Sequence, residues 1–206
     1  MQKAGNTWLP DGDHYFAPYF AKCDIFEPAN LLTGLKYVTN WDCAIDGGAH
    51  VGSWARALAA KFAQVYAYEP QPDNFYCLIA NTAHLSNVTQ HRLALGDRWG
   101  RVGLASGNNS GCWHIQDGKG ADLMPLDDCL YLAKREVGYL KLDVEGYEWY
   151  ALTGARNLIE RCKPVIQIEE KKLPHSYPCP LARNLLESMG YEEVDKSGRD
   201  VIFTCR

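Results

Sequence analysis

The sequence predicts an α/β fold with a mostly parallel seven-stranded sheet, helices on both faces and a C-terminal antiparallel β-hairpin. Short apolar runs alternate with helical patterns along the chain, which is typical of parallel sheets built from strand–helix–strand units. A glycine-rich loop joins the first core run to the next helical pattern, as in ligand-binding turns. The chain closes on two strand-like segments around the turn Ser197–Gly198, which predicts the hairpin.

The composition describes one globular domain. The 206 residues are enough for one sizeable α/β domain, with 47% hydrophobic and 22% charged residues and a formal net charge of −4. This weakly acidic balance disfavours non-specific binding to nucleic acid, which needs a basic face. No apolar run is long enough to span a membrane, and Met1–Thr7 is polar rather than a signal peptide. We therefore expect a cytoplasmic protein without a membrane partner.

The eight cysteines are expected to be reduced. None of them form a Cys-x-x-Cys pair, so a zinc ribbon or thioredoxin-type site is not indicated. Several lie within apolar patterns, where a thiol packs as a small hydrophobic group in a cytosolic protein. The oligomeric state stays open, including a homo-oligomer.

In chain order, residues 1–40 form an N-terminal arm and residues 41–206 form the main domain. Trp8–Phe16 lacks helical or strand periodicity, whereas Glu27–Leu35 is amphipathic and predicts a short helix. The arm either caps the substrate side of a pocket or only covers apolar surface. His14 is a candidate substrate contact, although most histidines are structural.

The main domain contains the other elements. An Asn- and Gly-rich turn inside 101–116 predicts an inserted β-hairpin, and a short helix is expected to open at Leu126–Asp128. The remaining predicted strands are 43–45, 65–68, 88–95, 139–142, 164–168, 191–195 and 199–204, and the helices are 53–63, 72–84, a segment around 149–154, and 181–189.

The loop from Asp46 to Gly52 is the most informative stretch. It has the form D-x-G-x-H-x-G, and no register supplies the G-x-G-x-x-G of a dinucleotide fold, so an NAD-linked oxidoreductase is disfavoured. An acid at the strand end suits S-adenosylmethionine (SAM), because its ammonium group is attracted by a carboxylate. Glu69 lies 69 − 46 = 23 positions later, about where an acid binds ribose hydroxyls. The alternative is a loop that only turns the chain.

Six motifs in order resemble the FkbM-type SAM-dependent methyltransferases, over about residues 41–170. This resemblance implies a Rossmann-like class I methyltransferase fold and methylation of a hydroxyl oxygen on a small molecule or glycan. It does not identify the acceptor. The motifs are Asp46–Gly52, Ala67–Pro70 with Asn74–Phe75, Leu93–Asp97, Asn108–Gly111, Met124–Asp128 and Leu140–Glu148.

The residues expected to bind SAM lie at strand ends. Asp46 would attract the amino group, and Glu69 would accept both ribose hydroxyls. The glycine loop would give main-chain contacts to the methionine part. Asp97 lies near the adenine or only caps a turn. The full set is Asp46, Gly47, Gly48, Ala49, His50, Gly52, Glu69, Pro70, Leu95, Gly96, Asp97 and Asp143.

Asp143 is the first candidate for the base that a hydroxyl acceptor needs, and His50 is the second. Asp143 could instead bind only the methionine amino group, and Glu145 could only cap the next helix. No metal is expected, although Asp143 with Glu169 is an alternative site for a hard divalent ion. The candidate substrate contacts are His14, Trp113, Glu145 and Glu169.

Two other functions stay open. Methylation of nucleic acid or protein is disfavoured because the tetrapeptide typical of amino-methylating enzymes is absent where Asp143–Gly146 stands. A SAM-binding module without catalysis is disfavoured by the intact Gly48, Gly52, Glu69 and Asp143.

Overall fold

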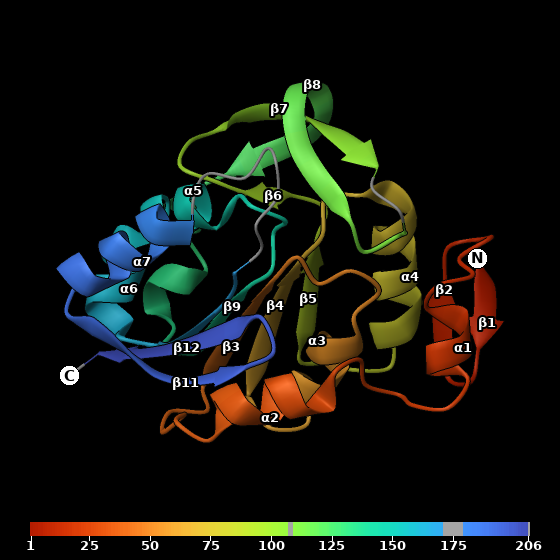
Figure 1. Ribbon diagram of the computed structural model, residues 1–206, viewed down its shortest axis with the longest axis horizontal. Coiled ribbons are helices and arrows are strands. Elements are labelled where there is room, and N and C mark those ends of the chain that lie inside the picture. The colour runs from red at the N-terminus through yellow and green to blue at the C-terminus, as the bar shows by residue number, and fades with distance from the viewer. Residues whose placement is uncertain (107–108, 171–178, 206) are drawn as a thin grey trace.

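The computed structural model describes residues 1–106, 109–170 and 179–205. A seven-stranded mixed sheet lies at its centre, with five parallel strands and with β12 antiparallel to both of its neighbours (Figure 1). The predicted α/β fold and C-terminal hairpin are thus confirmed, within a sheet that is mixed. In spatial order the strands are β11 (Tyr191–Ser197), β12 (Asp200–Cys205), β10 (Val165–Glu169), β9 (Val137–Leu142), β3 (Cys43–Gly47), β4 (Gln64–Tyr68) and β5 (Val88–His91).

Helices cover both faces of this sheet. Every residue of β3 is buried, because a central strand with helices on both sides has no solvent-facing side, which explains its continuous apolar run. One core contains residues of α5, α6 and α7, and the other contains residues of α2, α3 and α4. These helices are α2 (Pro28–Leu35), α3 (Ser53–Ala59), α4 (Pro72–Thr82), α5 (Glu148–Thr153), α6 (Arg156–Cys162) and α7 (Cys179–Ser188).

A small second sheet contains the inserted hairpin. Its strands are β6 (Ala94–Leu95), β8 (Trp113–Met124) and β7 (Gly100–Ser106), so the predicted hairpin is confirmed and its second strand is longer than expected. Asn108, in the predicted turn, lies outside the described residues. The single strand predicted at 88–95 is wrong: β5 ends at His91, and Leu95 then pairs in parallel with Met124. This tertiary pairing overrides the local strand preference.

The N-terminal arm has more regular structure than its sequence predicted. β1 (Gln2–Ala4) and β2 (Thr7–Leu9) form an antiparallel pair, and α1 (Ala17–Phe20) follows. Strands of three residues are too short to show the alternation of apolar and polar residues, so the hydrophobic pattern did not predict β1 and β2. Asn81 of α4 fastens the arm: the Trp8 amide donates to its Oδ1 at 2.7 Å, and its Nδ2 donates to the Trp8 carbonyl at 2.9 Å.

The segment after β8 is attached to α6 by hydrogen bonds of Asp127. The short helix expected to open at Leu126–Asp128 is present as the 3₁₀ helix η1 (Leu126–Asp128), and a second 3₁₀ helix, η2 (Leu132–Lys134), follows it. The Asp127 carboxylate accepts the amides of Asn157 and Leu158 at 3.0 and 2.8 Å, so it caps α6 and not its own turn. Within the described ranges, no helix is both long and apolar enough to cross a bilayer.

Candidate functional site

One cavity lies where the carboxyl ends of β3, β4, β9 and β10 meet the N-terminal arm and the β7–β8 hairpin. In a parallel sheet, ligands bind beyond these strand ends. Ten residues expected in the site line the cavity: Gly48, Ala49, His50, Glu69, Pro70, Leu95, Trp113, Asp143, Glu145 and Glu169.

The glycine loop is held against the end of β9. Gly48 has φ +73°, and a Cβ there would lie 1.9 Å from the Asp143 carbonyl oxygen, so only glycine fits. The loop amides expected to contact a ligand already have acceptors within the protein. Gly48 and Ala49 donate to the Tyr68 carbonyl at 3.0 and 2.9 Å, and Gly52 donates to the Ala49 carbonyl at 2.8 Å. The expected main-chain donation to a methionine part is therefore not available from these three groups.

Asp46 faces a lysine instead of the cavity. Its side chain is completely buried, and its Oδ1 lies 3.1 Å from Nζ of Lys141. The same Nζ donates to the Gly48 carbonyl at 2.7 Å and lies 5.6 Å from the Trp54 ring centroid. Burial lowers the pKa of Lys141, but the charges of Asp46 and Asp143 outweigh it and raise the pKa overall. Lys141 therefore stays protonated and shields Asp46 from a direct contact with ligand.

Glu69 follows β4 and is almost completely buried. Its two carboxylate oxygens accept the amides of Gln71 and His50 at 2.9 and 2.8 Å. Burial raises the pKa of Glu69 to about 7, although these two amides and the Asn74 side chain oppose the rise. A hydroxyl donor arriving from the cavity would favour the ionised form, so binding of a ribose would lower this pKa again.

A chain of polar side chains joins the arm, the hairpin and the glycine loop. The Ser110 hydroxyl donates to the Asp13 carboxylate, and Nε2 of His50 lies 2.8 Å from the Ser110 oxygen. The single hydroxyl proton of Ser110 is donated to Asp13, so the proton of the His50–Ser110 hydrogen bond must come from His50. Nε2 of His50 is therefore protonated and donates to the Ser110 oxygen. Burial lowers the pKa of His50 to about 4, so its ring is neutral at pH 7 and only weakly basic. Asp13 and Ser110 were not expected in the site.

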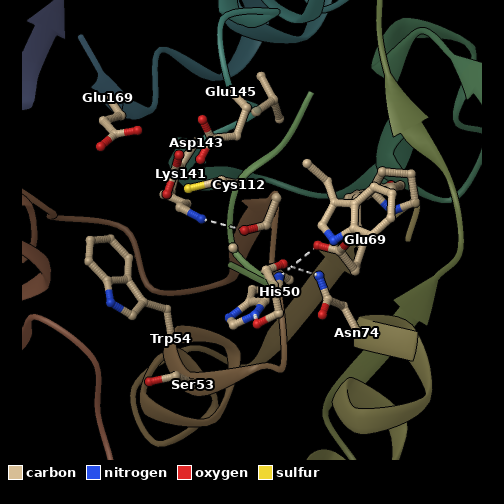
Figure 2. A pocket seen from close by; sticks show the side chains of 18 of the residues that line it. His50, Ser53, Trp54, Glu69, Asn74, Cys112, Lys141, Asp143, Glu145 and Glu169 are labelled. Atoms are coloured by element: carbon tan, nitrogen blue, oxygen red, sulfur yellow. Dashed lines mark hydrogen bonds between the residues drawn. The ribbon is translucent and has the colours of Figure 1, made fainter. Parts of the chain in front are cut away.

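Three carboxyl groups gather at the ends of β9 and β10. Oxygen atoms of Asp143, Glu145 and Glu169 lie within 4.8 Å of one another. Figure 2 shows this group across the cavity from Asn74. Glu169 also lies 3.0 Å from the exposed Arg199. The arrangement can orient a hydroxyl group and accept its proton, and it could also hold a hard divalent ion.

Glu145 is not the N-cap residue of α5, because Tyr147 stands at that position. Glu148 Oε1 accepts the amides of Val144 and Gly146 at 3.1 and 3.2 Å and so holds the turn after β9.

Six expected residues do not line this cavity. Asp97 forms an ion pair with the adjacent Arg98 at 3.1 Å. His14 lines a neighbouring pocket beside the arm, which shares Tyr15, Asn74, Asn109, Ser110 and Trp113 with this cavity. The six are His14, Asp46, Gly47, Gly52, Gly96 and Asp97.

Sequence reasoning missed several lining residues. Lys141 had a usable signal, because a lysine inside the apolar run Tyr139–Leu142 is rare unless it is paired. Asn74 is 2% exposed, its Nδ2 donates to the Ser110 carbonyl at 2.7 Å, and its Oδ1 has no hydrogen-bond partner among the described residues. A buried orphan oxygen at a cavity wall fits a ligand that supplies a hydroxyl or amino group. Both are present in SAM, and Glu69 suits its ribose, so the residues fit that cofactor.

Comparison with known proteins shows which family the chain belongs to. The model of the methyltransferase FkbM domain matches residues 46–193, more than half of the chain. No curated protein sequence matches the chain. Among solved structures, the chain is similar to methyltransferase FkbM from Methylobacillus flagellatus KT, with 20% identity, a TM-score of 0.50, and coverage of 96% of this chain and 48% of that chain. The chain therefore spans about half the length of that protein.

Two other similar structures cover most of both chains. Precorrin-6y C5,15-methyltransferase from Geobacter metallireducens GS-15 has 12% identity and a TM-score of 0.52, over 96% of this chain and 92% of that one. Precorrin 8w decarboxylase from Methanobacterium thermoautotrophicum has 16% identity and a TM-score of 0.51, over 86% and 89%. At these identities the likeness shows the fold alone.

Proposed function

Because this chain belongs to the FkbM methyltransferase family, we propose that it transfers a methyl group from SAM to a hydroxyl oxygen of a small molecule or sugar. Family membership supports the SAM-dependent methyl transfer, and the hydroxyl acceptor is the further part of the proposal. The observation that supports it is the position of the Asp143 carboxyl group, in the cavity beside Glu145 and Glu169. A hydroxyl acceptor needs such a base, because its own pKa is far above neutrality.

We assign the cofactor to the part of the cavity between β4 and β9. Glu69 accepts the ribose hydroxyls with the lone pairs that Gln71 and His50 leave available, and the orphan oxygen of Asn74 assists. The apolar side chains after β5 and from the hairpin border the adenine. They are Leu93, Ala94, Leu95, Leu104 and Ile115.

When bound, SAM supplies an electrophilic methyl group on a sulfonium centre. Asp143 orients the acceptor hydroxyl and takes its proton, and Glu145 and Glu169 hold other polar groups of the acceptor. Holding the acceptor in line accounts for much of the rate in such reactions. His50 is the weaker candidate for the base, since its pKa of about 4 leaves little driving force for proton transfer near neutrality.

Residues 1–40 are proposed to act as a cap over the acceptor, attached to the domain of residues 41–206. Tyr15, Phe16 and Phe26 of the arm line the cavity together with Trp113 of the hairpin. Aromatic rings of this kind pack against the apolar faces of sugars or ring-shaped small molecules. We also propose a cytoplasmic location, supported by the free thiols of Cys23, Cys43, Cys77, Cys129 and Cys162.

The test is transfer of a labelled methyl group from SAM into separate pools of sugars, small alcohols, proteins and nucleic acids, with and without a chelator. Label released as methanol by mild base would identify a methyl ester and would contradict an ether product. Label only in nucleic acid or protein would favour that alternative, and binding without transfer to any pool would favour a silent SAM-binding module. Loss of transfer with chelator would assign a metal to the three carboxylates.

A further inference from the structure

The ammonium group of Lys141 is the feature of the cavity that the assignments above leave unused. The Lys141 side chain is 7% exposed and lines the cavity (Figure 2). Its Nζ lies 2.7 Å from the Gly48 carbonyl oxygen and 3.1 Å from Asp46 Oδ1. An ammonium group has three N–H donors. Among the described residues these two contacts use two of them, so one donor remains for a ligand.

The charges that line the cavity are unequal. Among the described residues, the basic side chains that line the cavity are Lys141 and Arg199, and Arg199 is largely exposed and paired with Glu169 at 3.0 Å. An anionic part of a ligand would therefore find its compensating charge inside the cavity at Lys141 and repulsion elsewhere. The acidic lining residues are Glu27, Glu69, Asp143, Glu145, Glu169 and Asp200.

Lys141 and Glu69 are also suitably placed relative to each other. Glu69 accepts the amide of His50, and Lys141 donates to the carbonyl of Gly48. The two side chains therefore contact opposite ends of the three-residue segment Gly48–His50. Three residues span at most about 10 Å of chain. A ligand that puts its ribose on Glu69 and carries an anion at the end of a short flexible chain can reach both groups.

We propose that Lys141 binds the carboxylate of the methionyl part of SAM. Its third N–H donates to that carboxylate, its charge compensates the anion, and Asp46 keeps the lysine in place from behind. SAM has one carboxylate and no other anionic group, so the assignment is unique within the cofactor. The inference rests on the SAM dependence of the family and not on the hydroxyl acceptor.

The competing role for Lys141 is purely structural: neutralising buried Asp46 and fixing the Gly48 carbonyl. The two roles differ in what they do to ligands that lack the carboxylate. A structural lysine supports every adenosyl ligand equally, whereas a carboxylate-binding lysine supports only ligands that carry the carboxylate.

The experiment is calorimetry of the full chain with S-adenosylhomocysteine and with its decarboxylated analogue, which lacks only the carboxylate. For Lys141→Met we expect the Kd of S-adenosylhomocysteine to rise at least about tenfold, because a buried charge contact is lost. The Kd of the analogue should change less than about threefold by the same argument. Equal weakening of both ligands, or of neither, would overturn the proposal.

Two further variants keep the test decisive. Lys141→Met alone leaves Asp46 as an unpaired buried charge and can prevent folding. The double variant Asp46→Asn/Lys141→Met removes both charges, and it must show the same selective loss. Arg199→Met removes the second basic side chain that lines the cavity within the described part of the chain. That side chain is exposed, so the variant should leave the ratio of the two Kd values unchanged.

The wild-type protein separates this inference from the proposed function. If it binds neither ligand, the Lys141 assignment is overturned. If it binds S-adenosylhomocysteine with the expected dependence on Lys141 but methylates no hydroxyl, only the proposed acceptor chemistry fails.

Discussion

The cavity has two halves that are held together in different ways. In the strand-end half, at the ends of β3, β4 and β9, main-chain bonds join the neighbours: the Asp143 amide donates to the Gly47 carbonyl at 3.1 Å, and the Gly48 amide donates to the Tyr68 carbonyl at 3.0 Å. In the cap half, the arm and hairpin meet through the side chains of Asp13, Ser110 and His50.

This difference predicts which half tolerates change. A main-chain framework persists through most side-chain substitutions, provided that the glycines it needs are kept. Contacts between a few side chains of distant segments can be replaced one by one, at a cost of about 1 kcal/mol each. In the proposed function the strand-end half holds the cofactor and the cap half holds the acceptor, so substitutions in the cap half should be better tolerated.

The largest effect is expected in turnover. Asp143→Asn keeps the shape of the strand-end half but removes the proposed base, so kcat should fall about 10³-fold while the Kd of SAM changes little. Labelled methyl transfer and calorimetry measure the two quantities. The matched variant in the cap half is Trp113→Phe, for which we expect less than about a tenfold change in kcat, since general-base catalysis is intact. Full turnover by Asp143→Asn would remove it as the base.

Alanine substitutions at two glycines, Gly48 in the strand-end half and Gly12 in the arm, compare how strongly each half affects the free energy of unfolding. Gly48 and Gly12 have φ values of +73° and +76°, but a Cβ at Gly48 meets the Asp143 carbonyl oxygen at 1.9 Å, and a Cβ at Gly12 meets nothing within 4 Å. Gly12→Ala should cost about 1–2 kcal/mol, the penalty for a left-handed backbone alone.

Gly48→Ala should cost that amount and about 2 kcal/mol more, because overpacking adds to the strain. Thermal unfolding should therefore show a midpoint several degrees lower for Gly48→Ala than for Gly12→Ala, at about 2–4 °C per kcal/mol. Equal midpoints would mean that the loop is not held rigidly against β9.

The affinity for SAM should depend on pH through Glu69. Its pKa in the free protein is raised to about 7 by burial, and ribose hydroxyls donate to the ionised form. Affinity is therefore fully present above this pKa and is lost as the pH falls through it. Between pH 8 and pH 6 the Kd should rise about tenfold. Calorimetry across this range tests the slope, and Glu69→Gln should bind more weakly with a flat profile.

The smallest effect is expected from Ser110→Ala, which cuts the link between Asp13 and His50. We expect a loss of about 1 kcal/mol in stability. In hydrogen exchange the amides of Tyr15 and Phe16, which donate to Asp13 at 3.1 and 2.9 Å, should lose protection, while β3 and β9 keep theirs. Simultaneous loss of protection in the sheet would show that the two halves are not independent.

The elements that could be predicted are those with local signals. Apolar runs marked four of the five parallel strands, β3, β4, β9 and β10, and glycine with asparagine marked the hairpin between β7 and β8. The strand predicted at 88–95 failed because Leu95 pairs with Met124, almost thirty positions away. The short strands of the arm failed because three residues cannot show a period.

The candidate site divides in the same way. Glu69 and Asp143 line the cavity as expected, since an acid that ends a parallel strand must lie at the ligand-binding edge. Asp46 ends its strand too, but it is covered, because Lys141 pairs with it from the neighbouring strand. The contact between Asp13 and Ser110 could not be predicted from the sequence, since it depends on how the arm folds over the hairpin.

The sequence by itself indicated most strands and turns of the main domain, the acids at the strand ends and the glycine loop, because each depends on residues that are close along the chain. Only the tertiary structure decided which acid faces the cavity, which one is neutralised by a lysine, and how the arm is attached. Those outcomes depend on burial and on partners far away in sequence, and a carboxylate acquires its pKa and its contacts only once its surroundings exclude water.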